Sequence, residues 1–555
     1  IFIFMEKQIL IMRKILFYCL YLILLLPTVL FSQKFEKQDQ VRGAVTPERI
    51  WWDLLYYNIE VQPDIELKSI SGKNTIRYKV LQEYQQMQID LQAPMRILSV
   101  RQDGKNLAFN RKFGAYFIDL QKKQSPGDLN ELQIDFSGTP PEAGNPPWDG
   151  GFVWQKDQNN KDFIANASQL LGSSSWLPSK DHPYDEPDQG MDMRIKVPKE
   201  LMAVSNGRLM EVSEQHGKAM NYHWKVVNPI NGYGININIA DYQHFSESYQ
   251  GEKGSLDCDY YVLPYNLEKA KAHFEQVPKM LEALEHWFGP YPFYEDGYKL
   301  VEVPYLGMEH QSSVTYGNGY QNGYLGSDLS STGNGLKFDF IIIHESGHEW
   351  FANSLTNDDV GDMWIHEGFT TYSEVLYLDY HYGTKAGNEY LIGYRDRALN
   401  LAPVIGTYGL NQRGSNDMYI KGAAMIHTLR QVIDDDEKFR DILREMNKEF
   451  YHQTLSSAEL EAFLINKTGL QLQGFFDQYL REIKIPTVHI KIKKGKLYYR
   501  FKDIVKNFSI PVKFIVNGEA VWLQPTKKWK SHALAAPNAS VGIDENFYLQ
   551  TKRKN

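Results

Sequence analysis

Cysteine is scarce in this sequence: the 555 residues contain two, Cys19 and Cys258. Cys19 falls in an apolar leader, so the mature chain keeps only Cys258. This excludes an internal disulfide and a cysteine-rich metal site. Low-complexity tracts and internal repeats are lacking too. With 43% apolar and 23% charged residues, the composition is that of a soluble globular protein. The length is too great for a single core and predicts about three domains.

Long apolar runs are lacking outside the first 32 residues. There, a short basic region at 12–14 precedes an apolar run at 15–26, Pro27 breaks the run, and Ser32 ends a suitable cleavage site. The run is shorter than the ~20 residues that a membrane span needs. Residues 1–32 are therefore predicted to be a signal peptide. We expect an exported protein, periplasmic, secreted or at the cell surface, with no stable membrane span after cleavage. An uncleaved N-terminal anchor is the alternative.

The sequence also lacks a surplus of positive charge. Cleavage of the leader removes Glu6, Lys7, Arg13 and Lys14 and leaves 57 basic and 67 acidic residues, a net charge of −10. A nucleic-acid partner needs a basic surface, so the charge balance argues against one.

Short strands with alternating polar and apolar residues fill two parts of the chain. In residues 45–250, period-2 patterns such as 75–80 and 87–91 are separated by turns that contain glycine, which predicts an N-terminal β domain. The alternation returns after Pro486. Residues 487–555 are therefore predicted to form a C-terminal β-sandwich domain.

Helical periodicity dominates the segment between them, residues 251–486. Apolar residues recur every three or four positions from Leu267 to Trp287, and Pro278 within this stretch predicts a kink or two helices. The fold class expected is multidomain α+β. Further helices are predicted at about 336–355, 366–382, from near Tyr419 to 433, 437–450 and 458–466.

The residues that carry chemistry are concentrated around an HExxH motif at 344–348. His344 and His348 are four residues apart, so they share one face of a helix, and Glu367 follows after eighteen further residues. Two imidazoles and a carboxylate are good zinc ligands, and three protein ligands leave the fourth position open, as in catalytic zinc sites. Glu345 lies beside the metal as the general base for a water molecule. The motif therefore predicts one catalytic Zn2+ per chain.

A core helix whose histidines only hydrogen-bond to their neighbours is the alternative. Apolar residues such as Ile341 and Phe351 flank the motif on both sides, so the helix is predicted to be largely buried. Burying two histidines and two carboxylates without a metal would leave costly unpaired charges. This cost favours the metal site.

The roles of three more residues cannot be decided from their chemistry alone. Glu374 lies seven positions after Glu367, on the same helix face, and either accepts a hydrogen bond from a ligand histidine or is a surface carboxylate. Glu309 is one acidic residue on a polar segment and gains a role only if the substrate carries a cation. Tyr419 is one of 35 tyrosines, and its phenol is a group that can stabilise an oxyanion.

Residues 344–374, HESGHEWFANSLTNDDVGDMWIHEGFTTYSE, resemble the gluzincin zinc aminopeptidases, the family of aminopeptidase N and leukotriene A-4 hydrolase. The common features are the HExxH motif, the eighteen-residue gap, the Asp-Met-Trp lead-in and the Glu-Gly-Phe after the gap. The resemblance extends over nearly the whole mature chain. It implies a thermolysin-like mixed α/β catalytic domain between the two β domains. It also implies that His344, His348 and Glu367 are the zinc ligands and that Glu345 is the general base.

The family's Gly-x-Met-Glu-Asn motif appears here as the sequence LGMEH at residues 306–310. By resemblance, Gly307 and Met308 belong to the substrate-binding segment, and Glu309 binds the free α-amino group of the substrate.

Two further residues take their roles from the resemblance. The family's Tyr-x-Lys-Gly motif begins at Tyr419, which implies that this phenol stabilises the oxyanion of the reaction. The segment 176–181 is similar to the family's Leu-Pro-Cys-x-Asp stretch, and nine places before Pro178 stands Gln169. This matches a glutamine that lines the first specificity pocket in relatives.

The chain departs from the family pattern at several positions. Leu306 stands where the motif has its first glycine, His310 replaces the motif's asparagine, and His366 replaces the asparagine that usually precedes the third ligand. The residues after the small β domain are too few for the long helical C-terminal domain of many relatives. We therefore expect a short form whose cleft is more open or is closed by a partner.

The predicted function is a zinc-dependent aminopeptidase that hydrolyses the N-terminal peptide bond of peptides with a free N-terminus. One alternative is a zinc endopeptidase or another gluzincin hydrolase, which an open cleft would permit. The other is a non-catalytic secreted module that binds peptides or partners.

Overall fold

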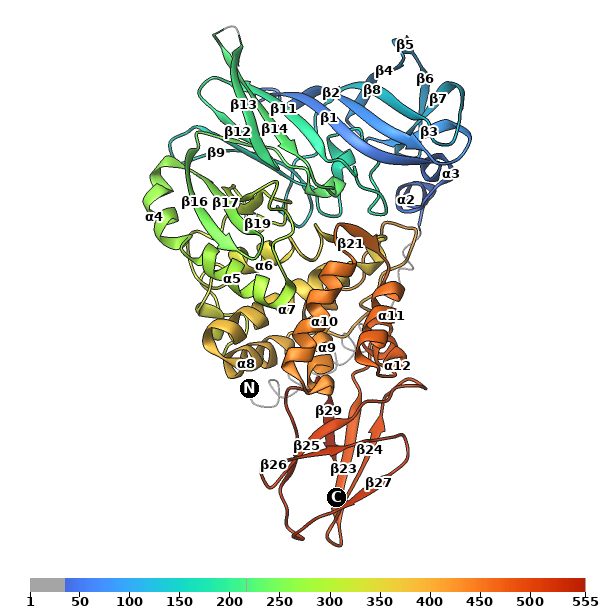
Figure 1. Ribbon diagram of the computed structural model, residues 1–555, viewed down its shortest axis with the longest axis vertical. Coiled ribbons are helices and arrows are strands. Elements are labelled where there is room, and N and C mark those ends of the chain that lie inside the picture. Colours follow the sequence, from blue (N-terminus) through green and yellow to red (C-terminus); the bar gives the residue numbers. More distant parts are fainter. Residues whose placement is uncertain (1–34, 216, 555) are drawn as a thin grey trace, which may run out of the picture.

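The computed structural model describes residues 35–215 and 217–554; the predicted signal peptide at 1–32 lies outside them. Figure 1 shows β-sheets at one end of the long axis, helices in the middle and smaller β-sheets at the other end. The predicted multidomain α+β class is confirmed. None of the helices in the described residues combines the length and the apolar character that crossing a membrane requires.

The N-terminal part is built from three sheets, preceded by two short helices, α2 (Lys37–Gly43) and α3 (Pro47–Ile50). The eight-stranded sheet has the order β13-β14-β11-β1-β2-β8-β4-β5, the four-stranded sheet β12-β15-β10-β9 and the three-stranded sheet β3-β7-β6. Their bounds are β1 (Trp52–Asp64), β2 (Ser69–Val80), β3 (Tyr84–Asp90), β4 (Arg96–Gln102), β5 (Lys105–Asn106), β6 (Ala108–Lys112), β7 (Ala115–Gln124), β8 (Leu129–Gly138), β9 (Gly151–Lys156), β10 (Asp162–Ala167), β11 (Met191–Pro198), β12 (Met202–Val204), β13 (Arg208–Gln215), β14 (Ala219–Val226) and β15 (Asn238–Ala240).

Alternation along the strands explains the core of this part. On β11 every second residue, from Met191 to Val197, is buried, which is the period that one buried face of a sheet requires. The indoles of Trp52, Trp176 and Trp224 are fully buried in the same cluster. Two 3-10 turns, η1 (Ser173–Ser175) and η2 (Gly232–Gly234), follow β10 and β14 and face the helical part.

A five-stranded sheet joins the N-terminal part to the helices. Its order is β16-β17-β18-β20-β19, with bounds β16 (Gln243–Gly251), β17 (Gly254–Val262), β18 (Tyr298–Glu302), β19 (Gly307–Met308) and β20 (Val314–Tyr316). Strands β16 and β17 form one hairpin, so the domain boundary predicted between residues 250 and 251 falls inside a pair of strands. The change from the N-terminal sheets to the five-stranded sheet therefore comes before β16. The sequence pattern shows that β16 is a strand, but it does not show with which strand β16 pairs.

The helices begin as predicted but differ in detail. Pro278 is the third residue of α5, in the first helical turn where its missing N–H costs nothing, and the chain forms two helices, α4 and α5, on either side of Phe274. The bounds are α4 (Leu267–His273), α5 (Gln276–Phe288), α6 (Phe340–Gly347), α7 (Trp364–Tyr382), α8 (Thr384–Arg395), α9 (Asp417–Ile433), α10 (Asp436–Glu449), α11 (Ser457–Thr468) and α12 (Gln473–Phe476), with a short parallel pair β21 (Leu355–Asn357) and β22 (Gln453–Leu455).

Helix α6 is shorter than the prediction of about 336–355. Asp339 caps it, because its side chain accepts hydrogen bonds from the N–H groups of Ile341 and Ile342. The chain leaves the helix at His348 and turns through Ala352, whose φ of 147° is in the region that favours glycine. The predicted C-terminal half of this helix is therefore a turn that leads into β21.

The C-terminal part has two sheets, consistent with the predicted sandwich. One has the order β27-β24-β23-β29 and the other β26-β25-β28. Aromatic side chains connect it to the helices: Tyr479 packs on Phe508 and on Tyr548. The bounds are β23 (Thr487–Lys493), β24 (Lys496–Lys502), β25 (Val512–Val516), β26 (Glu519–Leu523), β27 (Lys530–Ala533), β28 (Val541–Ile543) and β29 (Gln550–Arg553).

Helices α7 and α9 approach each other closely at two glycines. A Cβ on Gly422 would lie 3.0 Å from the Cα of Gly368, and a Cβ on Gly368 would lie 3.3 Å from the Cα of Gly422. Each helix carries a residue of the candidate site, Glu367 next to Gly368 and Tyr419 one turn before Gly422. The glycines therefore set how near these two side chains can come.

Replacing Gly422 with valine is expected to destabilise the protein by about 1–3 kcal/mol, because the added methyl groups force two packed helices apart. Chemical denaturation would measure the free energy of unfolding. The control is Lys385→Val on α8, where the lysine side chain is 88% exposed and valine should cost no more than about 0.7 kcal/mol. Equal stability of the two variants would contradict the close packing.

Candidate active site

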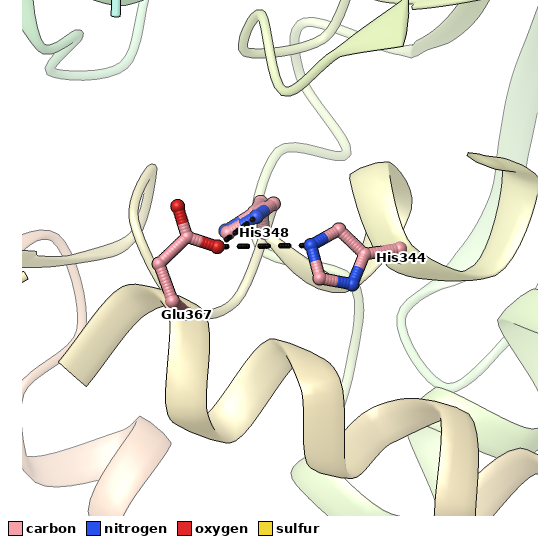
Figure 2. Close-up of side chains that lie close together, drawn as sticks. All are labelled: His344, His348 and Glu367. Atoms are coloured by element: carbon pink, nitrogen blue, oxygen red, sulfur yellow. Dashed lines mark ion pairs between the residues drawn. The ribbon is translucent and has the colours of Figure 1, made fainter. Parts of the chain in front are cut away.

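The three predicted metal ligands converge at the end of α6 and the first turn of α7. His344 lies in α6, His348 caps its C-terminus, and Glu367 is the fourth residue of α7. Figure 2 shows both imidazoles facing the Glu367 carboxylate. The Nε2 atoms of His344 and His348 lie 3.7 and 3.4 Å from Glu367 Oε2. One ligand atom from each residue lies within 4.8 Å of the others, which is compact enough to surround one ion.

The other ring nitrogen of each histidine has its own acceptor. His344 Nδ1 lies 2.7 Å from Glu374 Oε1, and His348 Nδ1 lies 3.0 Å from the carbonyl oxygen of Phe351. A proton on each Nδ1 satisfies these contacts and leaves both Nε2 lone pairs directed at Glu367. Such partners fix the tautomer and orientation of metal-binding histidines.

The buried carboxylate of Glu367 has one oxygen that no donor of the described residues contacts. Glu367 is 1% exposed, and its Oε2 has no hydrogen-bond partner among the described residues. Burial acts to raise the pKa of this carboxyl, but His348 and His344 outweigh it and hold the pKa below its ordinary value. An ionised, buried oxygen without a donor is costly, so the donor set fits a divalent cation with nitrogen and oxygen ligands.

Glu345 is 8% exposed and belongs to the same cluster. A carboxylate oxygen of Glu345, one of Glu309 and a ring nitrogen of His348 form a second group of possible ligand atoms within 4.8 Å of one another. Burial raises the pKa of Glu345 to about 7. His344 acts to lower this pKa, and the negative charge of Glu309 acts to raise it. A carboxyl with a pKa near neutrality is suited to accept and return a proton.

An amide from the N-terminal part links the remaining predicted residues. Gln169 Nε2 donates to Glu309 Oε1 at 2.7 Å and to Glu367 Oε1 at 3.0 Å. The hydroxyl of Tyr419 donates to the same Glu367 oxygen at 2.9 Å. Residues that are up to 250 positions apart in the chain therefore meet around one carboxylate.

Gly307 and Met308 form the edge strand β19 and pair with β20. Gly307 has a φ of 153°, and a Cβ there would lie 2.6 Å from Ile341 Cγ2 on α6. Only glycine lets this strand run so close to the helix that carries His344. The approach brings Glu309, two residues later, to the candidate metal ligands.

The sequence did not point to three neighbours of these residues. Tyr390 donates to Glu374, and Asn353 Nδ2 donates to the backbone oxygen of Glu309 at 2.9 Å. The phenol of Tyr233, on η2, is close enough to Glu309 for the two groups to affect each other's ionisation. No spacing rule connects these residues to the motif. For Asn353 the only available signal was its place five residues after His348.

The two histidines that depart from the family pattern have clear positions. His310 is fully buried, and its Nδ1 lies 3.2 Å from the carbonyl oxygen of Gly234, so it connects the segment after Glu309 to η2. His366 is 2% exposed, and its Nε2 accepts the N–H of Asn357 at 2.9 Å. Neither ring replaces a predicted ligand.

Comparison with known families agrees with this geometry. The model of the peptidase family M1 domain matches residues 272–479, and the model of the M1 N-terminal domain matches residues 54–233. The chain belongs to peptidase family M1. This membership confirms the resemblance that the motifs indicated.

Relatives in the family are distant. Probable aminopeptidase 2 of Sulfurisphaera tokodaii is 20% identical over 81% of this chain and 58% of its own length. Endoplasmic reticulum aminopeptidase 1 of Mus musculus is 23% identical over 49% of this chain and 30% of its own length. The chain spans about three fifths of the length of the first of these M1 relatives.

A solved structure supports the fold over most of the chain. The M1 zinc metallopeptidase of Deinococcus radiodurans, a mutant bound to a Tyr-Ser-Ala substrate, is 20% identical. It has a TM-score of 0.65 and covers 79% of this chain and 97% of its own. At this identity the likeness establishes the M1 fold, and the chemistry depends on the residues described above.

Proposed function

We propose that this chain is a zinc-dependent aminopeptidase that hydrolyses the N-terminal peptide bond of peptides. The observation that carries the proposal is Glu309. It is 2% exposed beside the candidate ligands, and no lysine or arginine in the described residues pairs with it. A buried carboxylate without a cation is costly, and the ammonium group of a peptide N-terminus is a cation of suitable size.

His344, His348 and Glu367 would hold the zinc ion. When bound, zinc supplies a Lewis acid that polarises the carbonyl to be attacked and makes water more acidic. The relatives that are zinc metallopeptidases and aminopeptidases support this choice of metal and substrate class.

The residues of the chain carry the remaining steps. Glu309 holds the substrate ammonium, and Gln169 keeps that carboxylate in place. Glu345 accepts a proton from the attacking water as the new carbon–oxygen bond forms, and later delivers it to the leaving amine as the carbon–nitrogen bond breaks. Tyr419 donates to the developing oxyanion, for which its hydroxyl must leave the Glu367 oxygen that it contacts here. Because the amine is held at a fixed distance from the metal site, the enzyme releases one N-terminal residue at a time.

Hydrolysis of aminoacyl anilides tests the proposal. We expect turnover that a zinc chelator removes and that added Zn2+ restores. Peptides with a free amine should be cleaved at least about 100-fold faster than their N-acetylated forms, because the acetylated amine has no charge for Glu309. Equal cleavage of both forms would indicate the endopeptidase alternative, and no cleavage of any substrate would favour the non-catalytic module.

A further inference from the structure

Positive charge is concentrated in the C-terminal part of this chain. Residues 487–555 contain 14 basic and 4 acidic residues, a net charge of +10. Residues 33–486 contain 43 basic and 63 acidic residues, a net charge of −20. The negative net charge of the whole chain therefore hides a strongly basic C-terminal part.

The basic residues gather on the outer face of the sheet β27-β24-β23-β29. On β23, Val488 and Ile490 are buried, and the residues that alternate with them lie on the outer face. Residues paired across strands share a face, as Lys493 and Lys496 do. None of the four strands contains an aspartate or a glutamate. The basic residues of this outer face, on or directly after three neighbouring strands, are Lys491, Lys493, Lys496, Arg500, Lys502, Lys552 and Lys554.

The charges on the outer face have no partner within the protein. None of the seven side chains forms an ion pair within residues 35–215 and 217–554. By contrast, Lys513 of the other C-terminal sheet lies 2.9 Å from Asp434. Burial and the positive charges of Lys554, Arg500 and Lys552 lower the pKa of His489 on the outer face, while Asp503 acts to raise it. The face is thus a positive surface that the chain itself does not neutralise.

Two partly exposed aromatic rings lie among these charges. Lys491 Nζ and Arg500 Cζ each lie 4.5 Å from the centroid of the Trp529 ring, which stands just before β27. Lys491 Nζ also lies 5.5 Å from the centroid of the Tyr498 ring. Tryptophan and tyrosine next to cations suit the interfacial region of a lipid bilayer, where one side of the ring is apolar and the other is wet.

The array of charges is two-dimensional. Adjacent strands are about 4.8 Å apart and alternate residues along a strand about 7 Å apart, so the charges spread in both directions of the sheet. A linear polyanion follows one line across such an array, whereas the headgroups of an anionic bilayer meet all of it. This difference favours a membrane surface as the partner.

The position of the sheet agrees with such a partner. Figure 1 shows the sheet at one end of the long axis, with the helices between it and the N-terminal sheets. Contact at this end leaves the candidate active site free, because that site lies where the helices meet the N-terminal part. The net charge of −20 on the rest of the chain is repelled by an anionic surface, which orients the chain with its C-terminal part toward the lipid.

We propose that the outer face of the sheet β27-β24-β23-β29 binds the surface of an anionic lipid bilayer and holds the protein there by electrostatic attraction. The inference goes beyond the proposed aminopeptidase function and is independent of it. Each lysine or arginine near an anionic surface strengthens binding about fivefold, and salt weakens the attraction.

Sedimentation of the predicted mature chain, residues 33–555, with lipid vesicles tests the inference. We expect binding to vesicles of phosphatidylcholine mixed with phosphatidylglycerol and no binding to vesicles of phosphatidylcholine alone, because only the mixture carries negative charge. Added salt should release the bound protein. Equal binding to both kinds of vesicle, or no binding to either, would overturn the inference.

Replacing three exposed lysines of the face together, Lys493→Gln, Lys496→Gln and Lys552→Gln, tests the assignment of the surface. Three lost charges at about fivefold each should lower the affinity for the anionic vesicles about 100-fold. Native affinity in this triple variant would show that the face is not the binding surface.

The matched control replaces three exposed lysines at the other end of the molecule, Lys105→Gln, Lys112→Gln and Lys122→Gln, on β5, β6 and β7. It changes the net charge by the same amount and should keep the native affinity. A loss equal to that of the first triple variant would assign the effect to net charge and overturn the inference.

Two more measurements complete the test. Retention on immobilised heparin without binding to the anionic vesicles would assign the face to a linear polyanion and overturn the membrane proposal. Hydrolysis of an aminoacyl anilide without vesicles should be equal in the native protein and both triple variants, which shows that all three are folded. If the native protein hydrolyses no anilide, the proposed function fails, and the vesicle result still decides this inference.

Discussion

Replacing Glu345 with glutamine is expected to lower kcat by about 100- to 10,000-fold while the zinc content stays at one ion per chain. The substitution keeps the shape of the side chain but removes its ability to accept a proton from water. Glu345 is not among the three converging ligands, His344, His348 and Glu367, so the metal should remain. Kinetics on an aminoacyl anilide and elemental analysis of the same preparation measure the two quantities.

Glu349→Gln, four residues further along the chain and just after the end of α6, is the matched control. Burial raises the pKa of Glu349 to about 8, so at pH 7 this carboxyl is mostly uncharged and glutamine changes little. Its Oε1 accepts the N–H of Ser312, a contact that an amide oxygen can keep. We expect kcat within about threefold of the native value. Retained activity in Glu345→Gln would assign the base elsewhere, and loss of zinc would show that Glu345 supports the metal.

The convergence of the three candidate ligands could be predicted from the sequence because local geometry determines most of it. Two histidines four apart on a helix must share a face, and a carboxylate on the following helix completes the set. Glu309 and Tyr419 were different. They reach the site only because β19 runs close to α6 and because α7 and α9 meet at two glycines. The spacing of residues along the sequence predicts neither of these approaches. A family resemblance supplied both residues.

The parts that the sequence missed depend on tertiary contacts. Helix α6 ends at Gly347 although the following residues have helical apolar spacing, and the turn after it places the Phe351 carbonyl oxygen against His348. Tyr390 contacts Glu374 from the next helix, α8. Tyr233 comes from the N-terminal part, about 75 residues before Glu309. A pattern within one element carries no information about such neighbours.

Replacing Glu309 with glutamine is expected to lower kcat/KM for free-amine substrates by about 100-fold, because an ammonium group would lose its charged partner in a buried site. The amide can still accept the hydrogen bond from Gln169, which now reaches Glu309 at 2.7 Å, so the local structure should persist. Zinc content should also be unchanged, because Glu309 lies outside the His344, His348 and Glu367 set.

The decisive quantity is the ratio of kcat/KM for a free peptide and for its N-acetylated form. In the native enzyme the free amine should be strongly favoured. In Glu309→Gln the ratio should fall toward one, because only the charged substrate loses an interaction, and the slow cleavage of the acetylated peptide should not change. The Glu349→Gln control should keep the native ratio. If Glu309→Gln lost activity on the free and the acetylated peptide equally, Glu309 would support the metal site and would not bind the substrate amine. The assignment of the amine site would then be wrong.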